Sequence, residues 1–233
     1  MAYLSPKTII VDFLRKNITD PRSRISTTSD SFTATALQKE FQLTPTAGKT
    51  LSHIISVTVA SATQSKWEDF YIDFKSQKVI FFTGVTLSAA VVISYGESEK
   101  NWIFPRMPNT KLNALSYPRM NVNVVSSPGS RLGNYEAPVE GVTRYQIDIW
   151  AKEKQNAQIF TIDSLKYTGE DLVEYLSYKI TKAFEDNEDE LFPALYGYDP
   201  VSMSPDLPFV DELQCHHKVV EFIARGLDIG RID

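Results

Sequence analysis

Residues 144–153, RYQIDIWAKE, decide the fold of the C-terminal half of the chain. Apolar and polar side chains alternate along the start of this stretch, as in a β-strand with one buried face. The apolar face consists of Tyr145, Ile147 and Ile149. The opposite face consists of Arg144, Gln146, Asp148 and Trp150. Because a large apolar ring costs free energy in water, we expect a second layer of this chain or another subunit to cover Trp150.

The neighbouring segments predict the partners of this strand. Residues 119–125 alternate in the same way, with Met120, Val122 and Val124 directed inward, so we expect a hairpin with residues 144–152. The loop between them, residues 126–143, is too long for a simple connector and is expected to have a function. Short strands are predicted around residues 157–164 and at residues 217–224, the latter before a flexible tail.

Two segments have helical patterns. Ser5 and Pro6 suit the start of a helix that ends near Asn17, and the polar residues 18–31 that follow predict a linker. Thr168 is placed to cap a second, longer helix, in which leucine, isoleucine and phenylalanine recur at helical spacing up to Phe184.

Residues 32–105 are rich in valine, isoleucine, threonine and aromatics, in short runs separated by turn residues. We expect a small β-sandwich or barrel here, with a hairpin around the KSQ turn. The strands are predicted at residues 32–43, 53–60, 67–74, 78–82 and 89–95. The predicted class is therefore α+β: a mixed or antiparallel sheet packed with two helices, formed by residues 1–31 and 106–233, and an inserted β-sandwich-like domain at residues 32–105.

The composition limits the possible functions. The 233 residues are 42% hydrophobic and 23% charged, which is typical of a soluble globular protein. We expect neither a membrane span nor a secretory signal, since the longest apolar runs are short. The single Cys215 excludes an internal disulfide and fits a reducing compartment. The net charge of −5 is spread along the chain, which argues against a dedicated nucleic-acid surface.

The sequence contains only weak matches to the motifs of catalytic and ligand-binding sites. AGKT at residues 47–50 ends like a phosphate-binding loop, but the position of the opening glycine is Leu43 and a strand pattern follows. Cys215, His216 and His217 are adjacent, and neighbouring strand residues point to opposite faces. The acidic residues 185–190 lack the spacing of a calcium loop and are interpreted as a solvated helix end. We therefore expect no catalytic, cofactor or metal site and no enzymatic activity.

The order of the elements resembles the tail terminator, or tail completion, proteins of tailed bacteriophages. The similar segments are SPKTIIVDFLRK (5–16), YPRMNVNVVSS (117–127), RYQIDIWAKEK (144–154), DLVEYLSYKITKAF (171–184) and HHKVVEFIAR (216–225). Compact members of that family pass from the first helix almost directly into the first strand, whereas here residues 32–105 intervene. The insert resembles, at the level of fold only, β-rich decoration domains of phage virion proteins.

The resemblance implies a non-enzymatic virion protein of the tail or neck, assembled in the host cytoplasm. Such proteins form a ring, commonly a hexamer, that caps the tail tube, meets the head-completion or connector protein and lets genomic DNA pass without specific binding. It also implies that the face of Trp150 lies at a subunit interface, with Arg144 and Asp148 available for pairing across it. Arg131 and Tyr135 of the long loop are expected to reach the tube or the adjacent subunit.

Alternatives remain. A head–tail connector stopper or adaptor in the neck has much the same sequence pattern. A baseplate- or fibre-associated module that binds host glycan would use exposed aromatics of the insert, for which Trp67, Tyr71 and Trp102 are candidates. An uncharacterised hydrolase would require Cys215 or a histidine in a reactive environment.

Overall fold

The computed structural model describes residues 6–105, 117–126, 129–131, 139–152, 159–162, 164–191, 197–198, 202–203 and 215–227. The fold is α+β, as predicted. The chain divides into two compact units, which we describe separately. The helical unit comprises Tyr3–Arg22 and Trp102–Asp233, and the β unit comprises Ser23–Asn101.

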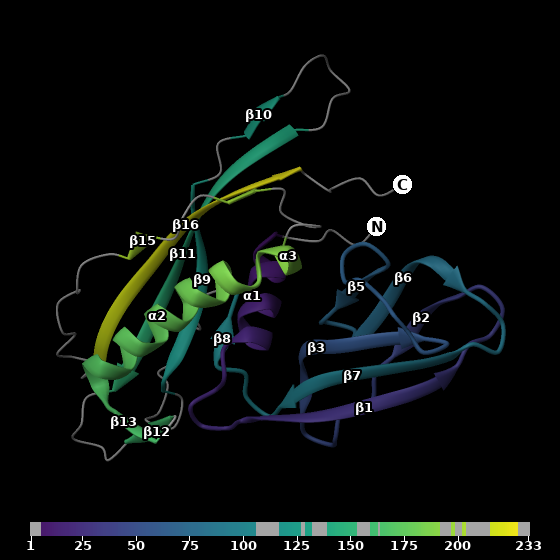
Figure 1. Ribbon diagram of the computed structural model, residues 1–233, viewed down its shortest axis with the longest axis horizontal. Helices are drawn as coiled ribbons and strands as arrows, with labels where there is room; N and C mark the ends of the chain where they lie inside the picture. Colours follow the sequence, from purple (N-terminus) through teal and green to yellow (C-terminus); the bar gives the residue numbers. More distant parts are fainter. Residues whose placement is uncertain are drawn as a thin grey trace. The chain divides into compact units, whose positions relative to one another are not determined.

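The helical unit is built on one mixed sheet with strand order β14-β16-β11-β9-β8, to which β10 and β15 add short pairings (Figure 1). Its strands are β8 (Ile103–Phe104), β9 (Arg119–Ser126), β10 (Gly129–Arg131), β11 (Val139–Lys152), β14 (Gly197–Tyr198), β15 (Ser202–Met203) and β16 (Cys215–Leu227). β9 and β16 both pair antiparallel with β11, so the predicted hairpin of β9 with β11 is confirmed.

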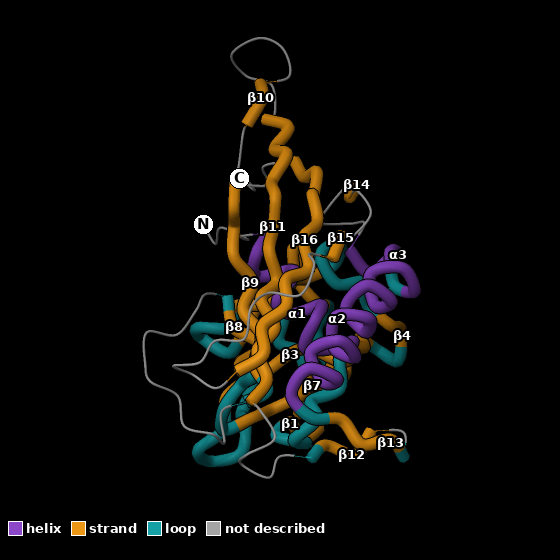
Figure 2. Tube along the Cα trace, turned by 90° about the vertical axis from the view of Figure 1, so that its left-hand side faces the viewer, coloured by secondary structure: helices purple, strands orange, loops and turns teal. Residues whose placement is uncertain are grey.

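Helices α1 (Pro6–Asn17) and α2 (Gly169–Asp186) pack together against one face of this sheet (Figure 2). That face is the apolar one predicted for β11, and Tyr145, Ile147 and Ile149 are all buried. Phe184 of α2 links the layers, because its ring lies 5.1 Å from Phe13 of α1 and 4.7 Å from Phe222 of β16. Among the described residues, no helix is long and apolar enough to span a bilayer.

Several boundaries differ from the predictions for this unit. The long loop at residues 126–143 is shorter than expected, because β10 pairs with the first residues of β11 and extends the hairpin. Around residues 157–164 a small hairpin forms instead of one strand, from β12 (Phe160–Ile162) and β13 (Leu165–Tyr167). The last strand runs on to Leu227. Thr168 lies at the N-cap of α2 without a side-chain capping hydrogen bond.

The β unit contains two antiparallel sheets around one apolar core. One sheet has the order β1-β7-β3-β4 and the other β2-β6-β5, which includes the predicted hairpin of β5 with β6. The strands are β1 (Ile25–Thr33), β2 (Gln38–Gln42), β3 (Thr50–Val59), β4 (Ala62–Thr63), β5 (Phe70–Asp73), β6 (Lys78–Val85) and β7 (Ala90–Ser98).

The linker predicted at residues 18–31 is wrong in its second half. Residues 25–33 form β1, which pairs along its whole length with β7. Serine and threonine dominate this strand, and they suggest a loop when composition alone is considered. Backbone pairing needs no apolar side chains, however, and Phe32 still packs against the core. The single strand expected at residues 32–43 is split, because Thr35–Gln38 forms a turn closed by a backbone hydrogen bond.

Candidate interaction surface

The polar face of β11 carries a hydrogen-bonded network centred on Asp148. Its carboxylate accepts hydrogen bonds from Asn121 Nδ2 (2.8 Å) and Asn123 Nδ2 (2.5 Å) on β9, from Gln146 Nε2 (2.8 Å), and lies 2.9 Å from His217 Nε2 on β16. The register explains this convergence, because Asp148 lies opposite Asn121 in one ladder and Trp150 lies opposite His217 in the other. Three adjacent strands thus contribute to one network.

The network keeps Asp148 ionised although its side chain is only 7% exposed. Burial alone would raise the pKa of this carboxyl, but the hydrogen bonds from His217, Gln146 and Asn121 outweigh burial and lower the pKa below its usual range. Asp148 is therefore a structural anchor of the sheet in the single subunit. Its predicted role in pairing with another subunit stays a prediction.

Trp150 is covered by its own chain. Its ring stacks on the imidazole of His217 with centroids 3.7 Å apart and planes 6° from parallel. The guanidinium of Arg119, opposite Trp150 on β9, lies 5.7 Å from the Trp150 ring and 4.9 Å from that of Tyr117. The tryptophan is 9% exposed, which leaves little of its surface for a partner to bury. Within the part of the chain that the structure describes, Trp150 Nε1 has no hydrogen-bond partner.

Of the other predicted interface residues, only Arg144 has a described side chain. Arg144 is exposed and pairs with Glu221 of β16, with 2.6 Å between the charged groups. The backbone of Arg131 belongs to β10 and lies opposite Val139. Tyr135 is outside the described residues. Arg144 and Asp148 therefore share a strand face, and they contact different residues of β16, Glu221 and His217.

Cys215 has an environment that disfavours a thiolate. It is fully buried beside Tyr117 and Trp150. Burial raises the pKa of its thiol, although a hydrogen bond with Tyr117 and the charges of Lys152 and Arg119 act in the opposite direction. Nucleophilic cysteines need the reverse shift and access to substrate. Among the described residues, no cluster of three potential metal ligands occurs.

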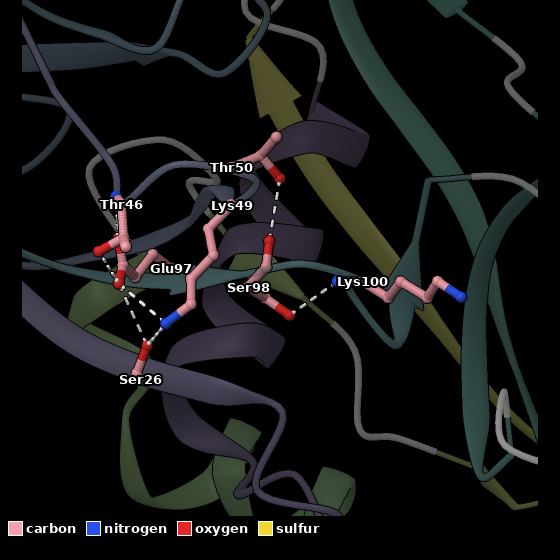
Figure 3. Close-up of polar contacts among 7 residues, drawn as sticks. All are labelled: Ser26, Thr46, Lys49, Thr50, Glu97, Ser98 and Lys100. Atoms are coloured by element: carbon pink, nitrogen blue, oxygen red, sulfur yellow. Dashed lines mark hydrogen bonds and ion pairs between the residues drawn. The ribbon is translucent and has the colours of Figure 1, made fainter.

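The AGKT string forms a turn in the β unit rather than a phosphate loop. Lys49 N donates to Thr46 O (2.9 Å), and Gly48 has the φ of +83° that the third position of a type II turn requires. Three side chains and one backbone N–H group then converge on one carboxylate (Figure 3). Glu97 of β7 accepts from Thr46 N (2.7 Å), Thr46 Oγ1 (2.8 Å), Lys49 Nζ (3.1 Å) and Ser26 Oγ (3.3 Å). Lys49 is therefore paired with a carboxylate of its own β unit.

The lowered pKa of Glu97 predicts that the β unit becomes less stable in acid. Burial opposes its ionisation, but the hydrogen bonds from Thr46 and Lys49 outweigh burial and lower the pKa to about 2. A lowered pKa contributes stability above the ordinary value, and that contribution is lost as the pH falls toward 2. We expect Glu97→Gln to lower the free energy of unfolding by about 1–3 kcal/mol at pH 7, and by clearly less at pH 3.

Urea unfolding of the full chain at both pH values, followed by circular dichroism, measures this difference. Glu40→Gln is the matched control, because the Glu40 carboxylate is 57% exposed and pairs with Lys78 at the surface. It should change stability by no more than about 0.5 kcal/mol. A loss for Glu97→Gln that is equal at pH 3 and pH 7 would contradict the proposed linkage.

The aromatic candidates for glycan binding do not form a common platform. Trp102 is fully buried, and Trp67 packs against the core of the β unit. Tyr71 is half-buried on the outer face of β5, with its ring 5.6 Å from that of Phe82.

The acidic run at residues 185–190 is less solvated than expected, because Glu190 of α3 (Glu188–Leu191) bonds to Lys16 and Asn17 of α1.

A groove between α2 and the β12–β13 hairpin is a feature that the sequence reasoning missed. Its volume is about 520 Å³. Its lining residues are Leu165, Lys166, Tyr167, Asp171, Glu174, Tyr175 and Tyr178. Leu165 and Tyr178 are 60% and 57% exposed. The spacing of Asp171, Tyr175 and Tyr178 in the sequence could have indicated this surface, because it places the three residues on one helix face away from the leucines.

Comparisons of the chain with protein-family models, curated proteins and solved structures found no match.

Proposed function

We propose that this chain is a structural virion protein of a tailed phage. In this proposal it is a tail terminator that forms a ring, caps the tail tube and joins it to the head-side connector, and the resemblance implies six copies in the ring. The observation that supports the proposal is the arrangement of the five similar segments. They are distant in sequence, and they fall on α1, β9, β11, α2 and β16 of one unit. The segments that carry the resemblance thus form a single layered unit rather than being scattered.

The surface of the helical unit also supports a role in assembly. It exposes large apolar side chains in two groups: Val124 and Val125 are adjacent on β9, and Leu165 and Tyr178 line the groove between α2 and the small hairpin. Exposed apolar side chains that gather on a surface mark interaction sites in soluble proteins. In the proposed ring, the acidic chain lines a channel through which DNA passes without specific contacts.

Electron microscopy of purified tail tubes from the phage that encodes this chain, mixed with the purified protein, tests the proposal. We expect closed rings with a central channel, bound at one end of each tube. Rings that bind the isolated connector and leave both tube ends bare would favour the stopper or adaptor function. Binding along the sides of tubes, or no binding to either structure, would contradict a role in the neck.

A further inference from the structure

The polar face of the sheet buries a cation. Arg119 of β9 is 4% exposed, and its guanidinium is permanently charged. The group lies 4.9 Å from the Tyr117 ring and 5.7 Å from the Trp150 ring. Within the described part of the chain, no hydrogen bond or ion pair reaches it. Aromatic faces offset part of the cost of burying a cation, but a buried charge is normally paired with an anion.

The carboxylate on the same strand face, Asp148, has no capacity left for Arg119. Asp148 Oδ2 accepts hydrogen bonds from two asparagines of β9, and Asp148 Oδ1 contacts the side chains of Gln146 and His217. Each carboxylate oxygen accepts about two hydrogen bonds, so all four positions are occupied. An anion that pairs with Arg119 therefore has to come from elsewhere.

Two more buried polar atoms beside Arg119 lack a partner. Among the described residues, Trp150 Nε1, Asn121 Oδ1 and Arg119 Nε have no hydrogen-bond partner. Arg119 lies directly opposite Trp150, and Asn121 lies opposite Asp148 at the next position of the same face, so the three groups are neighbours. The Asn121 amide has a fixed orientation, because its Nδ2 donates to the Asp148 carboxylate, which only accepts. The cluster thus offers two donors, one acceptor and a positive charge.

Lys152 adds a second positive charge to this cluster. Its Nζ lies 5.4 Å from the Tyr117 ring, which Arg119 also contacts. Burial raises the pKa of the Cys215 thiol beside Tyr117, and the charges of Lys152 and Arg119 both act to lower it. Both cations therefore act on the same small region of the sheet face, which favours a bound anion.

We propose that Arg119, Trp150 and Asn121 bind a free hydrogen phosphate ion, a site that does not depend on the proposed function. A buried water could satisfy the two donors and the acceptor, but it would leave the guanidinium without a counterion. A hydrogen phosphate ion supplies anionic oxygens for Arg119 and Trp150 and an O–H group for Asn121 Oδ1. Because Arg119 and Trp150 are only 4% and 9% exposed, the ligand is a small ion and not the phosphate group of a larger molecule.

The indole N–H signals of the full chain test the site by nuclear magnetic resonance. The chain has three tryptophans, and Trp150→Phe identifies the Trp150 signal by its loss. Inorganic phosphate is titrated at pH 7 into chloride buffer of constant ionic strength. We expect the Trp150 signal to shift until it saturates, and the signal of Trp67 in the β unit to stay in place.

Two substitutions and two other ions define the specificity. Arg119→Met removes the charge and should raise the dissociation constant for phosphate at least tenfold. Arg144→Met removes an exposed arginine of the same sheet face, which pairs with Glu221, and should leave that constant within twofold. Sulfate, which carries no proton for Asn121 at pH 7, and phenyl phosphate, which is larger, should each bind at least tenfold more weakly than phosphate.

Urea unfolding provides a second measurement. Phosphate that binds the folded chain should raise the unfolding midpoint of the wild type and leave that of Arg119→Met unchanged. In chloride alone, Arg119→Met should be at least as stable as the wild type, because it removes a buried charge that has no partner. If Arg119→Met does not fold, Trp150→Phe replaces it in the unfolding experiment, since it keeps a ring against His217 and removes only one donor.

A Trp150 signal that does not move with phosphate would overturn the proposal. So would equal phosphate binding by the wild type and Arg119→Met, or equal binding of phosphate, sulfate and phenyl phosphate by the wild type. A phosphate-dependent midpoint that persists in Trp150→Phe at its full size would also overturn it.

Discussion

Asp148→Ala is expected to lower the free energy of unfolding by about 3–5 kcal/mol. The substitution removes the shared acceptor of Asn121, Asn123 and Gln146 and the partner of His217. These donors lie on three strands of one sheet, and Asn121 is fully buried, so water cannot easily replace the carboxylate. Urea unfolding monitored by circular dichroism at pH 7 measures the loss.

Two control variants distinguish the loss of the hydrogen-bonded network from the loss of an exposed charge on the same sheet face. Asp148→Asn keeps the shape and one acceptor oxygen, so it should lose only part of that stability. Arg144→Ala removes an exposed charge of the same strand face and should cost no more than about 1 kcal/mol. Because the Asp148 pKa is lowered on folding, its contribution is present above the ordinary carboxyl pKa and is lost as the pH falls. Equal stabilities of wild type and Asp148→Ala at pH 7 would refute the role of the network.

Phe184→Ala is expected to cost about 3–5 kcal/mol, because it leaves a cavity where α1, α2 and the sheet meet. Phe184 is fully buried and contacts the rings of Phe13 and Phe222. The control is Tyr178→Ala on the same helix, where the side chain is 57% exposed and the expected change is within about 0.5 kcal/mol. Comparable losses of stability for the two variants would contradict the assignment of the Phe184 face of α2 as the face that packs in the core.

The Tyr178 control also bears on assembly. Since its removal should leave the fold intact, any change in mass that it causes reports on contact between subunits. Trp150→Glu cannot serve this purpose, because Trp150 stacks on His217 and is nearly buried in the single subunit. A charge placed there would disturb the sheet itself.

Periodicity predicted the elements whose side chains face a core. The alternation in β11 and the helical spacing in α2 each identify a buried face, and both faces are buried against each other. β1 escaped prediction because its pairing with β7 depends on backbone groups and not on an apolar pattern. Composition alone could not distinguish it from a polar linker.

The sequence predicts the candidate surfaces less well than it predicts the fold. Arg144, Asp148 and Trp150 were correctly placed on one strand face, but the partners that bury Trp150 and Asp148 come from β9 and β16. Which residues oppose one another depends on the register, and a bulge in β9 shifts it at Val125. The groove requires a helix and a hairpin to lie together, and no local pattern encodes that proximity.

The mass of the native protein in solution, measured by light scattering over a wide concentration range, tests the central claim most directly. The chain has a mass of 26.3 kDa. We predict one closed assembly, a hexamer by resemblance, whose mass stays constant once it has formed, because a closed ring has no free contact surfaces. A monomer at every concentration, or a mass that keeps growing with concentration, would contradict the account.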